Sequence, residues 1–139
     1  MPLGIFAPPL AASGGGGAQT NQVQTSPVNG TGAPTVVGQV GYIDSAGKFQ
    51  TADNGSALAA AARVIAIAVA ANGAAVLCVS AGIVTGLSGL TPGGDVFLGV
   101  AGALTQTAPT AGGKFITNLG CALSATSMSF APQPYTGPL

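Results

Sequence analysis

The sequence contains no histidine, no glutamate and no tryptophan, and it has only three basic and three acidic residues among 139. Histidine and glutamate are the side chains that most often move protons in enzymes, and histidine is also the commonest metal ligand. Without them, proton shuttling, histidine–metal sites and histidine-activated nucleophiles have almost nothing to work with. We therefore expect a protein that is not an enzyme, with no catalytic residues, no metal site and no cofactor.

Charge of either sign is scarce as well. Charged residues make up 4% of the chain, whereas soluble domains usually carry roughly a quarter. A net charge of zero gives no colloidal repulsion and favours association. Binding of nucleic acid through counterion release needs clustered lysine and arginine, which three scattered cations cannot provide. The composition predicts a protein that is surrounded by other protein in an assembly and does not bind nucleic acid.

Long uninterrupted hydrophobic runs are missing, although 47% of the residues are hydrophobic. The most apolar stretch, residues 57–71, is interrupted by Arg63 and is shorter than the roughly 20 residues that a helical membrane span needs. The N-terminus has no basic residue before its apolar part and contains three prolines among its first nine residues, so it is a poor signal peptide. We expect no membrane contact and synthesis in the cytoplasm.

Cysteine is limited to Cys78 and Cys121, each inside an apolar alternating run. The functional interpretations are a disulfide or half of a metal site. The simpler interpretation is two reduced core residues, because free cysteine packs as a small hydrophobic side chain. We favour the simpler one.

Residues 1–35 differ from the rest of the chain. They hold no charge, are rich in small and polar residues, and include the run Gly14–Gly17. Such a segment buries too little to order itself, which predicts an extended arm that is loose in the free protein. Its apolar anchors Ile5, Phe6 and Leu10 are expected to bind a partner protein or a neighbouring copy. A plain disordered tail is the alternative.

From residue 36 the chain alternates short apolar runs with turn residues, the pattern of an all-β sandwich or barrel. We expect a hairpin formed by 36–43 and 49–52, helical turns at 57–62, and a strand at 63–70 that turns at Asn72–Gly73 into a strand at 75–87. Further strands are expected at 95–100, 103–106, 115–123 and 127–130. Residues 36–131 would form the domain and 132–139 a C-terminal tail. The predicted core is Ile65, Ile67, Val69, Leu77, Val79, Phe97, Leu119 and Phe130.

No catalytic motif emerges from the polar residues. Asp44, Asp53 and Asp95 lie at predicted turns or strand starts, where aspartate caps backbone N–H groups. Lys48 and Lys114 each follow glycine but precede phenylalanine instead of serine or threonine, so neither belongs to a phosphate-binding loop.

Four stretches carry a resemblance to a known family: VGQVGYIDSAGKFQTA (37–52), ARVIAIAVAA (62–71), VLCVSAGIVTGLSGLTPGGDVFLGVAGALTQTAP (76–109) and LGCALSATSMSF (119–130). They resemble the capsid cement, or decoration, proteins that coat the heads of tailed bacteriophages. The resemblance covers about two-thirds of the chain and leaves the N-terminal arm outside it. It implies a small antiparallel β-sandwich of jelly-roll-like form, no catalytic site, and the major capsid protein as partner.

These observations together predict a structural virion protein on the outer surface of a phage capsid. It would bridge major capsid protein subunits and stabilise the DNA-filled head. We also expect a homo-oligomer, with a two-fold dimer ahead of a trimer because dimers bury self-matching patches. The alternative is a tail-fibre or other host-binding surface module, which would usually show clustered exposed aromatic residues or acidic sugar-binding residues.

Overall fold

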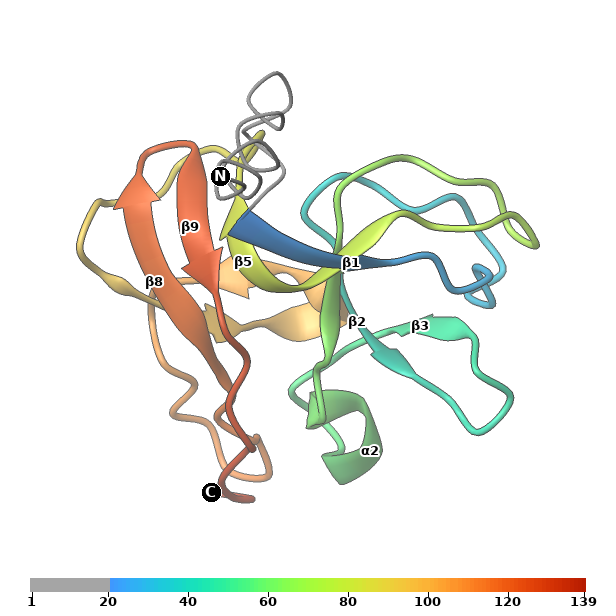
Figure 1. Ribbon diagram of the computed structural model, residues 1–139. Coiled ribbons are helices and arrows are strands. Elements are labelled where there is room, and N and C mark those ends of the chain that lie inside the picture. The colour runs from blue at the N-terminus through green and yellow to red at the C-terminus, as the bar shows by residue number, and fades with distance from the viewer. Residues whose placement is uncertain (1–20) are drawn as a thin grey trace, which may run out of the picture.

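The computed structural model describes residues 21–139, and within them nearly all regular structure is β (Figure 1). The strands form one curled antiparallel sheet. They are β1 (Gln22–Thr25), β2 (Val40–Ile43), β3 (Phe49–Thr51), β4 (Val64–Ala66), β5 (Cys78–Val84), β6 (Asp95–Leu98), β7 (Leu104–Thr105), β8 (Asn118–Ser124) and β9 (Ser127–Phe130). Apart from Asn21, which has 3-10 conformation, helical structure in the same residues is limited to α2 (Ala57–Ala60) and the 3-10 turn η3 (Val100–Gly102). The all-β expectation is confirmed.

The sheet runs in the order β3-β2-β4-β5-β9-β8-β6-β7, with β1 added to β5. Val79 of β5 faces both β1 and β4, and Gly82 faces both β1 and β9. A strand has only two edges, so β4 and β9 must share one edge of β5 while β1 occupies the other. The first half of β5 therefore belongs to the β2–β3–β4 side and its second half to the β8–β9 side. Figure 1 shows these two sides diverging from β5.

The space between the two sides is filled by the larger hydrophobic core. Its buried members come from both sides of the bend. They are Val40, Ala52, Ala62, Ile65, Val79, Val84, Leu87, Val96, Leu98, Leu119, Ala122, Met128 and Phe130. A smaller cluster on the other face of β4 contains Phe49, Val64, Ala66, Ala70, Val76 and Cys78. β4 is consequently buried on both faces, as its unbroken apolar sequence requires.

The hairpin expected around residue 46 is present, with its strands trimmed to β2 and β3. Asp44 accepts hydrogen bonds from the N–H groups of Ala46 (2.8 Å) and Lys48 (2.9 Å), and Gly47 adopts a φ of +79° that favours glycine. The expected helical turn is α2, whose N-cap is Ser56. The expected hairpin and the expected helical turn are therefore both confirmed.

The strand expected at 63–70 ends at Ala66. Beyond it the Thr35 hydroxyl donates to the carbonyl oxygen of Ala68 (3.1 Å) and accepts from the N–H of Ala70 (2.9 Å). Thr35 thus takes backbone groups that β5 would otherwise pair. The alternation expected beyond Ala66 is therefore wrong, and Val69, predicted to be in the core, is 68% exposed.

The other residues predicted to be in the core are buried in some cases and exposed or half-buried in others. Ile65, Val79, Leu119 and Phe130 are buried as predicted. Leu77 is exposed, because β5 begins only at Cys78. Ile67 and Phe97 are half-buried, Ile67 against the larger core.

The described part of the predicted arm, residues 21–35, lies within the fold. β1 pairs with β5, and Asn29 and Thr35 are buried. The Asn29 amide donates to the carbonyl oxygens of Ala33 (2.8 Å) and Ala70 (3.0 Å), and its Oδ1 accepts from the N–H and hydroxyl of Thr31. These residues fasten the 67–77 loop to the sheet. The predicted anchors Ile5, Phe6 and Leu10 lie outside the described residues.

The last residues of the chain also contact the domain. Thr136 forms a β-bridge with Ile116, and the Tyr135 ring packs edge-on against Phe115 at 5.1 Å. The N–H of Leu139 donates to the carbonyl oxygen of Lys114 (2.8 Å). The segment 132–139, predicted to be a tail, therefore follows the β8 side of the sheet.

Two glycines flank Phe130 in neighbouring strands. Gly82 of β5 and Gly120 of β8 both pair with Phe130 of β9, and their φ values are +124° and +136°. A Cβ atom on Gly82 would overlap the carbonyl oxygen of Asn21, and one on Gly120 would overlap that of Ser129. Only glycine permits this close approach of the strands beside the buried Phe130 ring.

Candidate interaction surface

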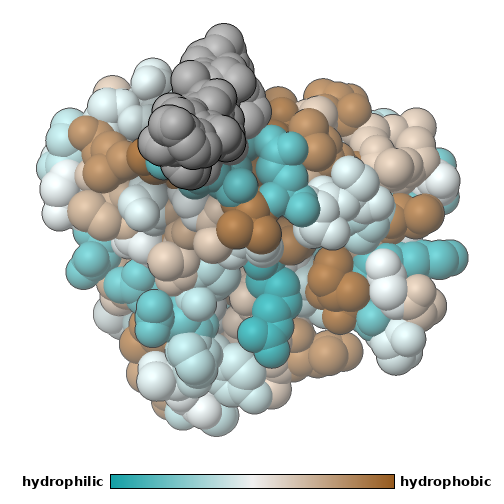
Figure 2. Space-filling model, in the orientation of Figure 1, coloured by the Kyte–Doolittle hydropathy of each residue, from teal (hydrophilic) through white to brown (hydrophobic). Residues whose placement is uncertain are grey.

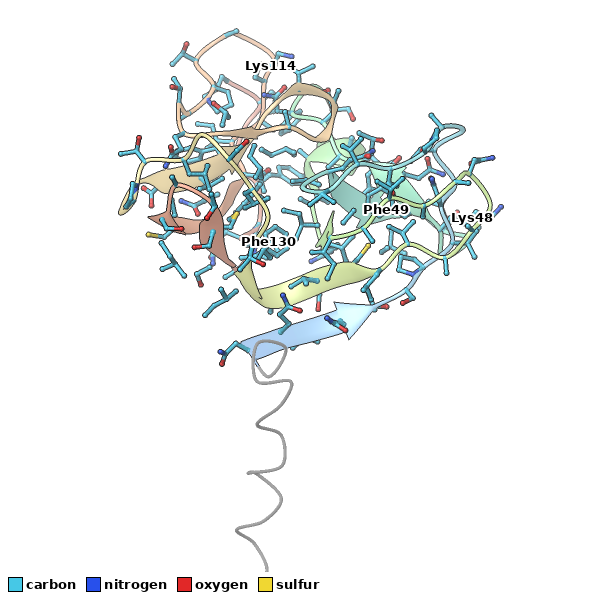
Figure 3. All side chains as sticks on the ribbon, turned by 90° about the horizontal axis from the view of Figure 1, so that it is seen from above. Lys48, Phe49, Lys114 and Phe130 are labelled. Carbon is cyan, nitrogen blue, oxygen red and sulfur yellow. The ribbon has the colours of Figure 1, made fainter. Side chains whose placement is uncertain are left out.

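The few charged side chains do not converge on a site. Asp44 stabilises its own turn, where the N–H of Lys48 and then the side-chain amide of Gln50 hold the pKa of its carboxyl below the ordinary value. Lys48 and Lys114 lie at separate places on the periphery, whereas Phe49 and Phe130 lie inside (Figure 3). Asp53 and Lys114 both lie close to Gly55.

The Asp53 carboxylate accepts hydrogen bonds from backbone groups both near it and far from it in the sequence. One carboxylate oxygen accepts from the N–H of Gly55 (2.8 Å) and the other from the N–H of Ala101 (2.7 Å). Ala101 has a φ of +54°, a left-handed conformation that costs an alanine roughly 1–2 kcal/mol. The Asp53 hydrogen bond helps to hold this turn, which leaves the neighbouring Val100 side chain 60% exposed.

The two cysteines are free, as expected. Cys78 is fully buried in the smaller core cluster, and this burial raises the pKa of its thiol to about 12. Cys121 is only half-buried, which corrects its placement in the core. Among residues 21–139, no three side chains of the metal-binding types lie together.

A first hollow of about 570 Å³ lies between the 36–39 turn and the η3 loop. Gly38, with a φ of +90°, allows that turn, and the N–H of Gln39 closes it by donating to the carbonyl oxygen of Val36 (3.1 Å). The turn leaves Val36 59% and Val37 43% exposed. Residues 51, 86–88 and 101–104 complete the lining.

A second hollow of about 580 Å³ adjoins the first, because Val37 and Gly86 line both. Its other lining residues are Gln22, Gln24, Ile67, Leu77 and Thr85. We call the two hollows together the Val37 groove. None of its lining residues carries a charge. A separate hollow of about 370 Å³ beside Arg63 and Tyr135 is smaller.

Exposed apolar side chains extend beyond the groove. The large ones are Val23, Val28, Val36, Val37, Ile43, Leu58, Val69, Leu77, Val100, Leu123, Tyr135 and Leu139. These twelve are twice as many as the six charged residues of the chain. Figure 2 shows apolar patches scattered between polar areas on one face of the molecule. The arrangement favours broad contact with another neutral surface over recognition of a charged ligand.

The sequence did not reveal the groove. Residues 36–43 were expected to form one strand, but the first strand residue is Val40, so Val36 and Val37 face solvent in a turn. Pro34 before them and Gly38 after them were the available signals, since both residues interrupt strands.

Comparison of the chain with family models and with curated proteins found no match in either case. Within residues 21–139, no helix is both long and apolar enough to cross a membrane.

Proposed function

We propose that this protein is a structural virion protein that decorates and cements the outer surface of a tailed-phage capsid. The observation that carries the proposal is the neutral surface, on which exposed apolar side chains outnumber charged ones. Its partner would be the major capsid protein, in keeping with the resemblance of residues 37–130 to cement proteins. The protein would be made in the host cytoplasm and act on the virion.

A physical argument supports this role. Bridging two capsid subunits requires a broad, close-fitting surface that excludes water, and it requires no titrating group. Each exposed valine or leucine that becomes buried contributes at most about 1.5–3 kcal/mol, so a single copy binds modestly. Many copies on a closed shell add such contacts and resist opening of the shell together.

The finer architecture belongs to the same proposal. The two sides of the sheet that diverge from β5 would be the two layers of a small sandwich of jelly-roll type, with the larger core between them. Self-association on the shell would add contacts between copies, with a two-fold dimer as the first arrangement to test.

The direct test is binding to phage heads. Purified protein would be mixed with DNA-filled heads of the encoding phage that lack it, and bound protein would be measured by co-sedimentation and located by cryo-electron microscopy. We expect saturable binding on the outside of the head and heads that open at a higher temperature. Binding to tails alone would support the host-binding alternative, and absence of binding to either would refute the proposal.

Two controls make the test specific. Because the contact is neutral, binding should change little when sodium chloride is raised, since salt screens only charge interactions. Aspartate would also be placed singly at Val36, Leu58, Val100 and Leu123, all largely exposed. Variants on the binding face should lose occupancy while the others bind normally. Equal binding by all four would argue against an apolar contact at any of these positions.

A further inference from the structure

We propose that the Val37 groove binds the N-terminal segment of the same chain, with Ile5, Phe6 and Leu10 seated in its two hollows. In the free protein this segment would cover the groove instead of remaining loose. The inference concerns the isolated protein and holds whether or not that protein coats a capsid.

The chemistry of the groove matches the segment. Every groove residue is uncharged, and the chain has no charged side chain before Asp44, so docking would desolvate no charged side chain. Val36, Val37 and Leu77 offer exposed apolar surface along the groove. Ile5, Phe6 and Leu10 are separated from β1 by the Ser- and Gly-rich stretch 13–17, which has no large side chain of its own to bury.

The chain is long enough for this docking. The structure begins at Asn21, one residue before Gln22, which itself lines the second hollow. Residues 11–20 can span at most about 33–36 Å, and a domain of this size has a radius of gyration of about 13–14 Å. The segment therefore reaches any part of the groove without crossing the molecule.

Tethering favours the same chain over a second copy. A short flexible linker gives its attached segment an effective concentration of about millimolar, far above the micromolar concentration of other copies in a dilute solution. Where both partners present the same groove, the tethered one is occupied first.

The absence of tryptophan permits a clean test. In the full-length Phe6→Trp variant the indole is the single tryptophan and reports on its own surroundings. We expect emission at shorter wavelength than in the urea-unfolded protein, and several-fold slower quenching by acrylamide. Both signals should be independent of protein concentration, and light scattering should give the mass of one chain at low concentration.

Groove variants then assign the site. Val37→Asn and Leu77→Asn, made in the Phe6→Trp protein, should shift the emission to longer wavelength and restore fast quenching. Leu58→Asn is the matched control, because Leu58 is exposed on α2 and lines neither hollow. It should leave the emission unchanged. Circular dichroism of each variant checks that the sheet is intact, and both groove positions are exposed enough to accept asparagine.

Three outcomes would overturn the inference. The first is a fully exposed tryptophan in the folded Phe6→Trp protein. The second is a buried tryptophan that does not respond to either groove variant. The third is burial that appears only as concentration rises, together with the mass of a dimer, which would assign the segment to the groove of a second copy.

Discussion

Gly82 is the residue of β5 that faces both β1 and β9, and its replacement by alanine tests the described fold. A Cβ atom there would overlap the Asn21 carbonyl oxygen and lie 2.7 Å from the Cα of Gln22. Both contacts are backbone atoms, so no side-chain rotation can relieve them. The Gly82→Ala protein must either shift β1 away from β5 or move β5 itself.

The expected cost has two parts. A φ of +124° is unfavourable for alanine, and positive φ costs roughly 1–2 kcal/mol. Loss of the β1–β5 pairing removes several hydrogen bonds, each worth about 0.5–1.5 kcal/mol net. We expect Gly82→Ala to lower the free energy of unfolding by about 3–6 kcal/mol in total. Gly73→Ala is the matched control, because Gly73 has a φ of +87° and nothing within 4 Å of the added Cβ. It should cost only about 1–2 kcal/mol.

Urea unfolding followed by circular dichroism measures both values, and amide hydrogen exchange locates the change. In Gly82→Ala the amides of β1 should exchange much faster than in the wild type, while those of β8 keep their protection. In Gly73→Ala the β1 amides should be unaffected. If the two variants lose the same stability and β1 stays protected in both, then β1 does not approach β5 as closely as the structure shows.

Three other results are expected. Asn29→Ala should lower the free energy of unfolding by about 2–3 kcal/mol, because it removes the four hydrogen bonds of a buried side chain. Asn72→Ala removes one exposed hydrogen bond, accepted from the N–H of Gly32, and should cost less than about 1 kcal/mol in the same denaturation curve. At pH 8 a thiol reagent should label Cys121 rapidly and Cys78 only on unfolding, because burial raises the pKa of the Cys78 thiol to about 12. Mass spectrometry of quenched samples measures the labelling of each cysteine. Labelling of Cys78 in the folded protein would contradict this prediction. Because its pKa is lowered, the ionised Asp44 carboxylate stabilises the fold above the ordinary value of 3.8, and this stabilisation is lost as pH falls through the folded value. Asp44→Asn should therefore lower the melting temperature between about pH 5 and 7 and flatten the acid side of the thermal-stability profile.

The sequence predicted those elements whose signals are local. The hairpin around Gly47 needs a turn aspartate and a glycine with positive φ, and both stand between two apolar runs. α2 begins at Ser56, a preferred N-cap residue, followed by alanines and a leucine. These features depend only on residues that are close together in the sequence, so the sequence pattern predicts them.

The missed features depend on long-range contacts. Residues 22–25 have no apolar alternation, and they form β1 only because β5 offers a free edge 53 to 60 positions later in the chain. Asn29 and Thr35 look like ordinary loop residues, yet their side chains bond backbone groups of the 67–77 loop. By drawing that loop away from β5 they expose Val69, whose alternation with its neighbours predicted burial. The Val37 groove was missed for the same reason, since its lining comes from segments far apart in the sequence.

The fold needs few charged side chains, because neutral ones can form the hydrogen bonds that its backbone requires. At three places a neutral side chain satisfies backbone groups: Asn29 at the loop, Thr35 beside Ala70, and Gln106, whose amide pairs with both the N–H (2.7 Å) and the carbonyl oxygen (3.0 Å) of Thr91. Asp44 and Asp53 are the charged exceptions among these turns. Neutral hydrogen bonds of this kind satisfy a fold without lysine or glutamate on the outside. Charged surface residues normally keep a protein soluble; under the proposed role, contact with capsid protein would take their place.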